Sequence, residues 1–241
     1  MRVHVVQHVA FEGPGSIAEW ARERGHELTD GLALTEEFPA AEAVDFLVVM
    51  GGPMAADDEV ASPWLVAEKH FIAETIAAGR IVLGVCLGSQ IVAEVIGGRI
   101  RRNDFKEIGW LAVEPTDDAP FEHLFSQWTG PVVVGQWHGD TFDLPEGMEP
   151  VLSSEACRNQ AFVFDGRVVG TQFHLEWTWD GLTELLVACP EDFDDRGRYV
   201  TSPEQFLDEA PERIAACRSR LFTLLDGMAA IGPGVAGDAA L

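Results

Sequence analysis

The sequence predicts an α/β fold with an open, mostly parallel central sheet and helices on both faces of that sheet. Short apolar runs alternate with amphipathic stretches along the first part of the chain, which is the order of repeated strand–helix units. Two of the runs, residues 45–50 and 81–85, are apolar throughout, as expected of strands that helices cover on both faces. The second run leads directly into a helical stretch, and a cysteine, Cys86, stands at the junction.

The elements expected in the first half follow from local signals. Residues 1–7 are rich in β-branched residues, which favour a strand. Apolar residues recur at helical spacing between the strands, Pro63 opens one helix, and Gly25, Gly79 and Gly97 follow the helix ends. Strands are therefore expected at residues 1–7, 45–50 and 81–85, and helices at residues 16–24, 63–78 and 87–96.

The second half changes character and contains more strands than helices. Asp165 and Gly166 form a strong two-residue hairpin signal between two apolar runs. A tryptophan-rich turn and an acidic loop at residues 190–198 precede a final helical run, and residues 191–195 of that loop are interpreted as a solvated surface. Strands are expected at residues 108–113, 131–137, 161–164 and 167–173, and a helix at residues 203–228. We interpret residues 1–241 as one domain with a flexible end at about residues 230–241.

The balance of charge argues against two classes of partner. Asp and Glu number 40 against 16 Lys and Arg, a formal net charge of −24, whereas nucleic acids and anionic membranes attract clustered Lys and Arg. No apolar run approaches the roughly 20 residues that a membrane span needs, and the first residues lack the apolar stretch and cleavage site of a signal peptide. We therefore expect a cytoplasmic protein that binds neither nucleic acid nor membranes.

Cys86 is the candidate nucleophile because of its position between a buried strand and a helix. Gly84 and Gly88 flank it, which matches the G-x-nucleophile-x-G elbow with Cys in place of Ser. Glycines at these places avoid clashes with the neighbouring strand and helix, and the helix N-terminus favours a thiolate. The N–H of Leu87, at the start of that helix, is free to bind an oxyanion.

The other three cysteines, Cys157, Cys189 and Cys217, lack such a turn and are interpreted as structural. The four cysteines contain no C-x-x-C pair, so the sequence does not indicate a disulfide framework.

His174 is the best candidate for the base that activates Cys86. It ends an expected strand, and Glu176 follows two residues later, so the two side chains face the same side of an extended chain. His138 also ends a strand and is the alternative base. His4 and His8 have the spacing of metal ligands, but no Cys or carboxylate cluster supports a metal site. We expect neither a metal nor a cofactor.

Gly51, Gly52 and Pro53 follow a buried strand, so they lie at the carboxyl edge of the sheet, where ligands bind in open α/β folds. Glycines there allow backbone N–H groups to approach a ligand closely, although a plain turn is the alternative interpretation.

Together these segments resemble the class I (triad-type) glutamine amidotransferase family, and within it stand-alone proteins close to the glutaminase domain of GMP synthase. The segments appear in the order that the family has. They are GGP at residues 51–53, GVCLGSQ at 84–90, QWHGDTF at 136–142, NQAF at 159–162 and GTQFHLE at 170–176.

The resemblance implies a flavodoxin-like fold and a glutaminase reaction through a γ-glutamyl thioester. Cys86 would be the nucleophile, His174 the base and Glu176 its orienting carboxylate, while Gly52 and Leu87 would form the oxyanion hole. The implied substrate is glutamine or a small γ-glutamyl compound. The residues implied to bind it are Gly51, Gln90, Gln136, Trp137, His138 and Asp140.

One departure and one absence leave alternatives open. The family usually has Pro between the histidine and the glutamate, and this chain has Leu175 there. These 241 residues also contain no phosphate loop of the G-x-x-x-x-G-K-S/T type. The chain is therefore a glutaminase that supplies ammonia to a separate synthetase subunit, a hydrolase of a γ-glutamyl peptide or amine, or a catalytically silent binding subunit.

Overall fold

A computed structural model describes residues 1–116, 123–194 and 197–234 of the chain. The described residues form a ten-stranded sheet in the order β10-β5-β7-β8-β9-β4-β3-β1-β2, with β6 paired to β5. The strands are β1 (Arg2–Gln7), β2 (Glu27–Leu32), β3 (Phe46–Val49), β4 (Ile81–Val85), β5 (Arg99–Pro115), β6 (Val132–Asp143), β7 (Leu152–Ser153), β8 (Ala161–Phe164), β9 (Val168–Thr171) and β10 (Tyr199–Val200).

Parallel pairing runs through the half of the sheet that carries the buried strands. The pairs β2–β1, β1–β3, β3–β4 and β4–β9 are all parallel. The pairs β9–β8, β8–β7, β7–β5 and β5–β6 are antiparallel, and the short edge strand β10 pairs with β5 in parallel. The expected α/β fold with a mostly parallel sheet is thus confirmed, and an antiparallel part extends it.

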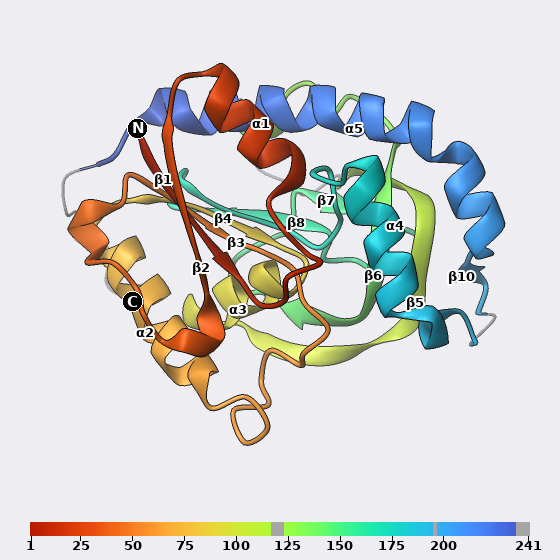
Figure 1. The fold of residues 1–241 in the computed structure, drawn as a ribbon, viewed down its shortest axis with the longest axis horizontal. Coiled ribbons are helices and arrows are strands. Elements are labelled where there is room, and N and C mark those ends of the chain that lie inside the picture. Colours follow the sequence, from red (N-terminus) through yellow and green to blue (C-terminus); the bar gives the residue numbers. More distant parts are fainter. Residues whose placement is uncertain (117–122, 195–196, 235–241) are drawn as a thin grey trace.

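The described residues contain five α-helices, which cover the two faces of the sheet (Figure 1). They are α1 (Gly15–Glu23), α2 (Trp64–Ala77), α3 (Leu87–Val95), α4 (Trp179–Ala188) and α5 (Pro203–Ile231). Helices α1 and α5 contact each other, and so do α2 and α3. Successive residues of one strand serve opposite faces: Phe46 packs in the apolar cluster that includes α1 and α5, and Leu47 in the cluster that includes α2 and α3. Continuous apolar strands are therefore required for burial on both faces.

Most of the expected elements of the first half lie within a residue or two of their predicted bounds. Strand β2 was not expected, because its sequence ELTDGL is polar and it forms an exposed edge of the sheet. Helix α4 was not expected either, since its first turn contains Trp179 and Gly181. The Thr178 side chain accepts a hydrogen bond from the Gly181 N–H and caps the helix.

Strands β5 and β6 are longer than predicted. They pair along most of their length as a long antiparallel ribbon, and the register shifts between Arg102 and Glu107. This irregularity and the polar residues around it mask the strand pattern in the sequence. At the other end of the chain, α5 runs to Ile231, so the start of the expected flexible end is helical, while residues 235–241 lie outside the described part.

No helix among the residues that the structure describes is both long and apolar enough to cross a membrane.

Trp20 fixes α1 to the sheet and to α5, and its loss is expected to be costly. Its side chain is fully buried, lies edge-on to Phe46 and donates a hydrogen bond from Nε1 to Asp226 on α5 at 2.8 Å. We expect Trp20→Ala to lower the free energy of unfolding by about 3–5 kcal/mol, because the loss of a large buried ring leaves a cavity. Asp226 would lose one hydrogen bond but would keep its ion pair with Arg24. Urea denaturation measures this. The control Val60→Ala, at a residue that is 95% exposed, should change stability by less than about 0.5 kcal/mol.

Candidate active site

Cys86 stands at a sharp turn between β4 and α3. Its backbone angles, φ 51° and ψ −109°, lie in a region that residues other than glycine rarely adopt. A Cβ on Gly84 would come within 2.5 Å of the Gly88 carbonyl oxygen, and a Cβ on Gly88 would collide with the Val49 carbonyl oxygen. The two flanking glycines therefore allow strand, turn and helix to pack closely enough to hold Cys86 in this strained conformation.

The parallel register brings three distant segments to one edge of the sheet. Strand β4 lies between β3 and β9, with Gly84 opposite Val49 on one side and Val85 opposite Thr171 on the other. Since all three strands run in the same direction, the residues that follow them come together at the carboxyl edge. Gly51, Cys86 and His174 meet there: a Cβ on Gly51 would lie 3.3 Å from His174 Cε1 and 3.6 Å from Cys86 Cβ.

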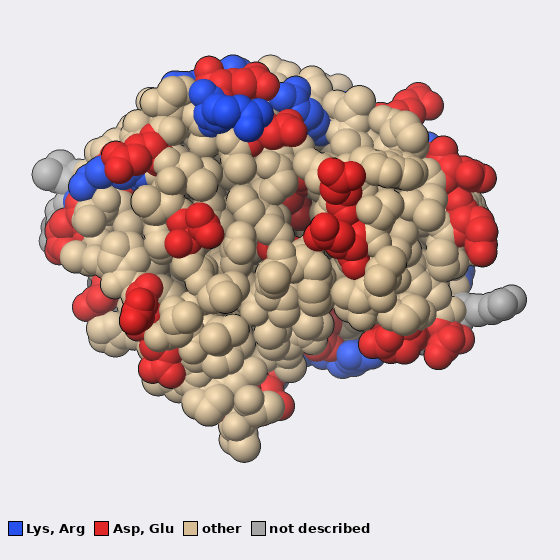
Figure 2. Space-filling view, viewed as in Figure 1, with Lys and Arg blue, Asp and Glu red and all other residues tan. Residues whose placement is uncertain are grey.

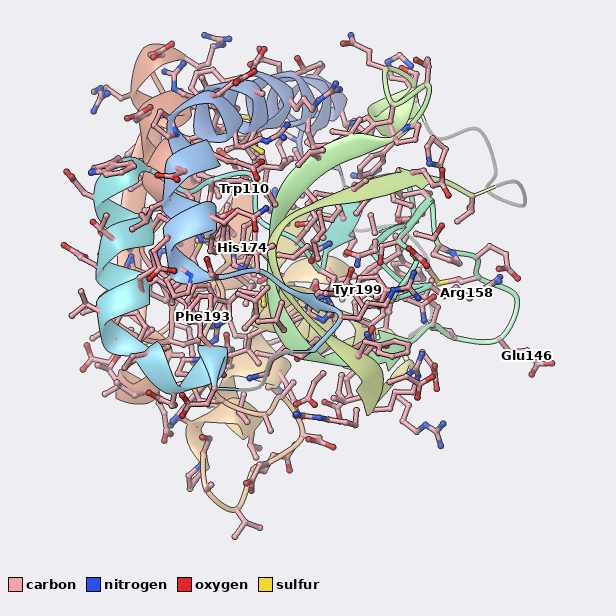
Figure 3. The ribbon with its side chains drawn as sticks, turned by 90° about the vertical axis from the view of Figure 1, so that its right-hand side faces the viewer. Trp110, Glu146, Arg158, His174, Phe193 and Tyr199 are labelled. Carbon is pink, nitrogen blue, oxygen red and sulfur yellow. The ribbon has the colours of Figure 1, made fainter. Side chains whose placement is uncertain are left out.

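His174 is fixed by its backbone, by Glu176 and by a stacked ring. Its N–H donates to the Gly135 carbonyl on β6 at 2.8 Å, and its Nδ1 lies 2.6 Å from Glu176 Oε1. The ring stacks on Trp177 with centroids 4.3 Å apart and planes at 15°. Figure 3 shows His174 between helices α4 and α5 on one side and strands β5 and β6 on the other. The imidazole therefore has little freedom to turn.

Leu175 supplies a hydrogen bond that the usual proline does not offer. Its N–H donates to the second carboxylate oxygen of Glu176, Oε2, at 3.0 Å. Proline has no N–H, so it would stiffen this turn only through its ring. In this chain the Glu176 carboxylate is held at both oxygens, one by His174 and one by the backbone. The substitution thus exchanges one way of fixing the pair for another.

The electrostatic setting of His174 favours its protonated form. Burial alone lowers the pKa of the imidazole, but the adjacent Glu176 charge and hydrogen bonds with Cys86 and Glu176 together raise it well above the ordinary value. The thiol of Cys86 is also within reach of the Trp137 carbonyl, at 3.6 Å, and of the Gln172 amide, at 3.8 Å. Cys86, His174 and Glu176 form a buried series, in which Glu176 is hydrogen-bonded to His174 and Cys86 lies beside the His174 ring.

Two backbone N–H groups lie beside this series without protein partners. Gly52 and Leu87 both line the cavity that contains Cys86, and the hydrogen bonds of the described residues leave both N–H groups unused. The N–H of Leu87 is at the start of α3, where the helix dipole favours negative charge. Such a pair of donors can bind a negatively charged oxygen.

A cavity of about 300 Å³, here called the reaction cavity, opens above Cys86. Four of the expected substrate contacts line it: Gln90, Trp137, His138 and Asp140. Gly51 and Gln136 do not. Gln136 is fully buried, and its amide donates to Gln160 at 2.9 Å. The cavity wall also contains Glu12, Arg102, Lys106, Glu191 and Asp192, none of which was expected in the site.

The acidic loop is part of the site rather than a purely solvated surface. Asp192, in a short 3-10 helix (Pro190–Phe193), accepts hydrogen bonds from Trp137 Nε1 at 2.8 Å and from Lys106 at 2.7 Å. The prediction of a solvated surface is therefore wrong at Asp192. Sequence spacing did not indicate this contact, because the two partners of Asp192 lie more than 50 residues away along the chain.

Glu12 lies in the loop after β1, and sequence reasoning missed it. Its carboxylate approaches Gly51 beside His174 and has no hydrogen-bond partner among the described residues. Burial and the nearby Glu176 charge raise the pKa of Glu12, while His174 and His8 lower it, and the net shift is upward. Its place after a parallel strand, at the ligand-binding edge, was the one signal that could have identified it.

The remaining cysteines differ from Cys86 in their surroundings. Burial raises the pKa of the Cys157 and Cys189 thiols to about 11 and that of Cys217 to about 12. Cys189 lines the reaction cavity, whereas Cys217 lies within α5. None of the three stands at a strand-to-helix turn.

One buried group, Glu107, His138 and Cys157, brings together side chains of the kind that bind metals, with ligand atoms within 4.8 Å of one another. Its chemistry fits a hydrogen-bonded network better. Glu107 contacts His138 Nε2 at 3.0 Å and accepts from Ser154 and Gln160 at 2.8 Å each. The raised pKa of Cys157 disfavours the thiolate that a metal requires. The contact with Glu107 and one with the Asp140 carbonyl occupy both nitrogens of His138.

Comparisons with known proteins agree with the geometry. The family Glutamine amidotransferase class-I matches residues 16–183. The glutamine amidotransferase-like protein YfeJ of Salmonella typhimurium is 32% identical over 200 residues, which cover 81% of this chain and 84% of that protein. A GMP synthase of Pediococcus pentosaceus is 30% identical over 54% of this chain, and the match spans only 24% of that enzyme.

Solved structures agree as well. A glutamine amidotransferase of Thermotoga maritima superimposes with a TM-score of 0.86 at 32% identity, covering 95% of this chain and 97% of the other. One from Methylobacillus flagellatus gives 0.89 at 27% identity, covering 100% and 98%.

Glu12→Gln is expected to stabilise the protein at neutral pH. The pKa of Glu12 is higher in the folded protein than in the unfolded chain, so the unfolded chain loses this proton at a lower pH. Between the two pKa values, folding therefore becomes less favourable as the pH rises. The variant should have the higher free energy of unfolding at pH 7, and the gain should vanish below the ordinary carboxyl pKa of about 4. Urea denaturation across this pH range measures it. A Glu12→Gln variant less stable than wild type at pH 7 would contradict the raised pKa of Glu12. The control is Glu184→Gln, at an exposed carboxylate, which should show no such gain.

Proposed function

Because the chain belongs to the class I glutamine amidotransferase family, we propose that it hydrolyses the γ-amide of glutamine through a thioester on Cys86. The observation that carries this proposal is the buried series Glu176–His174–Cys86 beside the unused N–H groups of Gly52 and Leu87. A nucleophile, a base held by a carboxylate and donors for an oxyanion are the parts that acyl transfer needs.

The reaction divides into two half-reactions. Cys86 sulfur attacks the amide carbon, and the amide oxygen takes up negative charge, which the N–H groups of Gly52 and Leu87 stabilise. His174 holds the thiol proton and delivers it to the leaving nitrogen, so the C–N bond breaks and ammonia departs. Water then attacks the γ-glutamyl thioester with His174 as base, and glutamate and the free thiol are regenerated. Glu176 accepts from His174 Nδ1–H throughout and keeps Nε2 directed at the sulfur.

The charged side chains of the reaction cavity suit an amino-acid head group. Arg102 pairs with Asp140 at 3.0 Å, and Lys106 pairs with Asp192 at 2.7 Å, so both signs of charge face the cavity. An α-carboxylate and an α-ammonium can each find an opposite charge there. We propose these pairs, with Gln90, Trp137 and His138, as the substrate contacts, and Gly51 as the backbone that flanks them. The burial of Gln136 supports a structural role for that residue.

The fate of the ammonia is a separate part of the proposal. The GMP synthases that this chain resembles are named as glutamine-hydrolysing enzymes, and the matched region is about a quarter of each. We propose that this chain supplies ammonia to an acceptor subunit or releases it directly. Added acceptor protein would increase glutaminase turnover in the first case and leave it unchanged in the second.

Cys86→Ala is expected to abolish the release of ammonia and glutamate from glutamine, because no thioester can form. An electrophilic glutamine analogue, 6-diazo-5-oxo-norleucine, should add covalently to the wild-type protein and not to the variant, as mass spectrometry of the intact protein would show. Cys217→Ala, at a buried thiol in α5, is the matched control and should retain both reactions. Wild-type protein that binds glutamine but neither turns it over nor reacts with the analogue would instead favour a silent binding subunit.

A cavity next to the reaction cavity favours a second candidate substrate, a γ-glutamyl amide of a larger amine. This second cavity, about 250 Å³, shares Glu12 and Leu185 with the reaction cavity and is bordered by Glu176, Asp180 and Glu184. The described residues that line it include no Lys or Arg. Acidic side chains gather over α4 in Figure 2. Since His174 protonates the leaving nitrogen, a larger amine would extend from that side and would meet Glu12.

Wild-type protein that uses this second substrate class should prefer a cationic leaving amine. We expect kcat/KM for N-γ-glutamyl-1,4-diaminobutane to exceed that for N-γ-glutamyl-butylamine, and Glu12→Gln to reduce the preference by about tenfold, the effect of one lost charged hydrogen bond. Coupled detection of released glutamate measures both rates. Equal values for the two amides, or a preference that persists in Glu12→Gln, would leave glutamine as the better-supported substrate.

A further inference from the structure

A buried pair, His8 and Glu68, lies directly behind the Gly51–Gly52 peptide. His8 is the first residue after β1, and Glu68 is on α2; both side chains are fully buried. His8 Nδ1 lies 2.9 Å from the Gly51 carbonyl oxygen, and His8 Nε2 lies 2.9 Å from Glu68 Oε1. The ring also packs near Trp64, with centroids 5.5 Å apart. Neither residue takes part in the reaction proposed above.

The chemistry of the two contacts fixes the direction of each hydrogen bond at His8. A carbonyl oxygen only accepts, so Nδ1 carries a proton and donates it to Gly51. Nε2 then shares a proton with the Glu68 carboxylate. Burial lowers the pKa of His8, but the charge of Glu68 and the hydrogen bonds to Glu68 and Gly51 raise it to a net upward shift, to which Glu12 adds. Glu68 on α2 and Glu12 in the loop after β1 are the charged groups that face this ring.

The peptide that His8 contacts is the one that carries the Gly52 N–H. In a planar trans peptide the carbonyl of one residue and the N–H of the next point in opposite directions, and the described residues contain no cis peptide. With the Gly51 carbonyl turned toward His8, the Gly52 N–H is turned away from it. Gly52 lines the reaction cavity together with Cys86 and Leu87.

Glycines on both sides of a peptide make its orientation easy to reverse, because neither residue has a Cβ to restrict it. Packing limits the space here: a Cβ on Gly52 would lie 2.9 Å from both His8 Cβ and Leu87 Cδ2. A hydrogen bond to the Gly51 carbonyl favours one orientation, and by polarising the peptide it also strengthens the N–H as a donor. A buried ion pair by itself adds little to stability. The role of the His8–Glu68 pair is therefore to fix the orientation of the Gly51–Gly52 peptide.

We propose that His8, held by Glu68, is a positioning residue that keeps the Gly52 N–H directed at the oxyanion of the intermediate. This inference rests on the proposed function, in which Gly52 supplies one of the two oxyanion donors. It assigns the pair a role in the chemical step rather than in substrate binding.

His8→Leu tests the role with two readouts that a merely structural role would move together. We expect kcat for glutamine hydrolysis to fall on the order of 10²-fold with KM nearly unchanged, the size of effect seen when one oxyanion donor is lost. Alkylation of Cys86 by iodoacetamide should keep its wild-type rate, because displacement of iodide forms no oxyanion. His8→Gln, whose amide can still donate to the Gly51 carbonyl, should recover most of kcat.

His4, on the strand β1 that leads to His8, provides a matched control. It is buried, its Nδ1 contacts Thr29 at 2.8 Å, and it makes no hydrogen bond to the Gly51–Gly52 peptide. His4→Leu should leave kcat unchanged. If His8→Leu does not fold, Glu68→Leu gives the same test, because it leaves the His8 ring unsupported and should lower kcat in the same selective way.

The outcomes separate this inference from the proposed function. A loss of kcat with alkylation unchanged supports it, whereas unchanged kcat, or kcat and alkylation falling together, overturns it. If the wild-type protein hydrolyses no γ-glutamyl amide, the proposed function fails. The positioning role is then decided by crystal structures of wild type and His8→Leu: a reversed or doubly occupied Gly51–Gly52 peptide in the variant supports it, and an unaltered peptide refutes it.

Discussion

The strained backbone at Cys86 is the constraint on which the site depends. A positive φ at a non-glycine residue costs free energy, and it persists because the strand before it and the helix after it are both buried. Gly84 and Gly88 let those two elements approach each other and the end of β3 without side chains between them. The stability of the parallel sheet thus holds Cys86 at the N-terminus of α3, where it lines the reaction cavity.

Around that sulfur, backbone groups act as much as side chains. The Trp137 carbonyl contacts the thiol, the Gly135 carbonyl holds the His174 backbone, and the Leu175 N–H holds Glu176. The last of these contacts explains how the chain does without the usual proline. A proline restricts φ through its ring, whereas Leu175 keeps an N–H that binds the carboxylate directly. Either device limits the motion of the His174–Glu176 pair.

One ionisable group near the site is kept in an environment that does not favour stability. The pKa of Glu12 is raised because its carboxyl is buried and lies near the Glu176 charge. A group that costs folding free energy and lies beside a candidate nucleophile is typical of sites arranged for chemistry. The contrast with Cys217, whose thiol is simply buried in α5, illustrates the difference between a packed cysteine and one held at a turn.

The sequence by itself determined the buried strands of the parallel half of the sheet, the turn at Cys86 and the pairing of His174 with Glu176. Those features depend on local patterns: continuous apolar strands, flanking glycines and a spacing of two residues in an extended chain. Tertiary structure alone decided the positions of Glu12, His8, Arg102 and Asp192, and it moved Gln136 out of the cavity wall. These residues lie on different elements and meet because of strand register and the irregular β5–β6 ribbon, which no local pattern encodes.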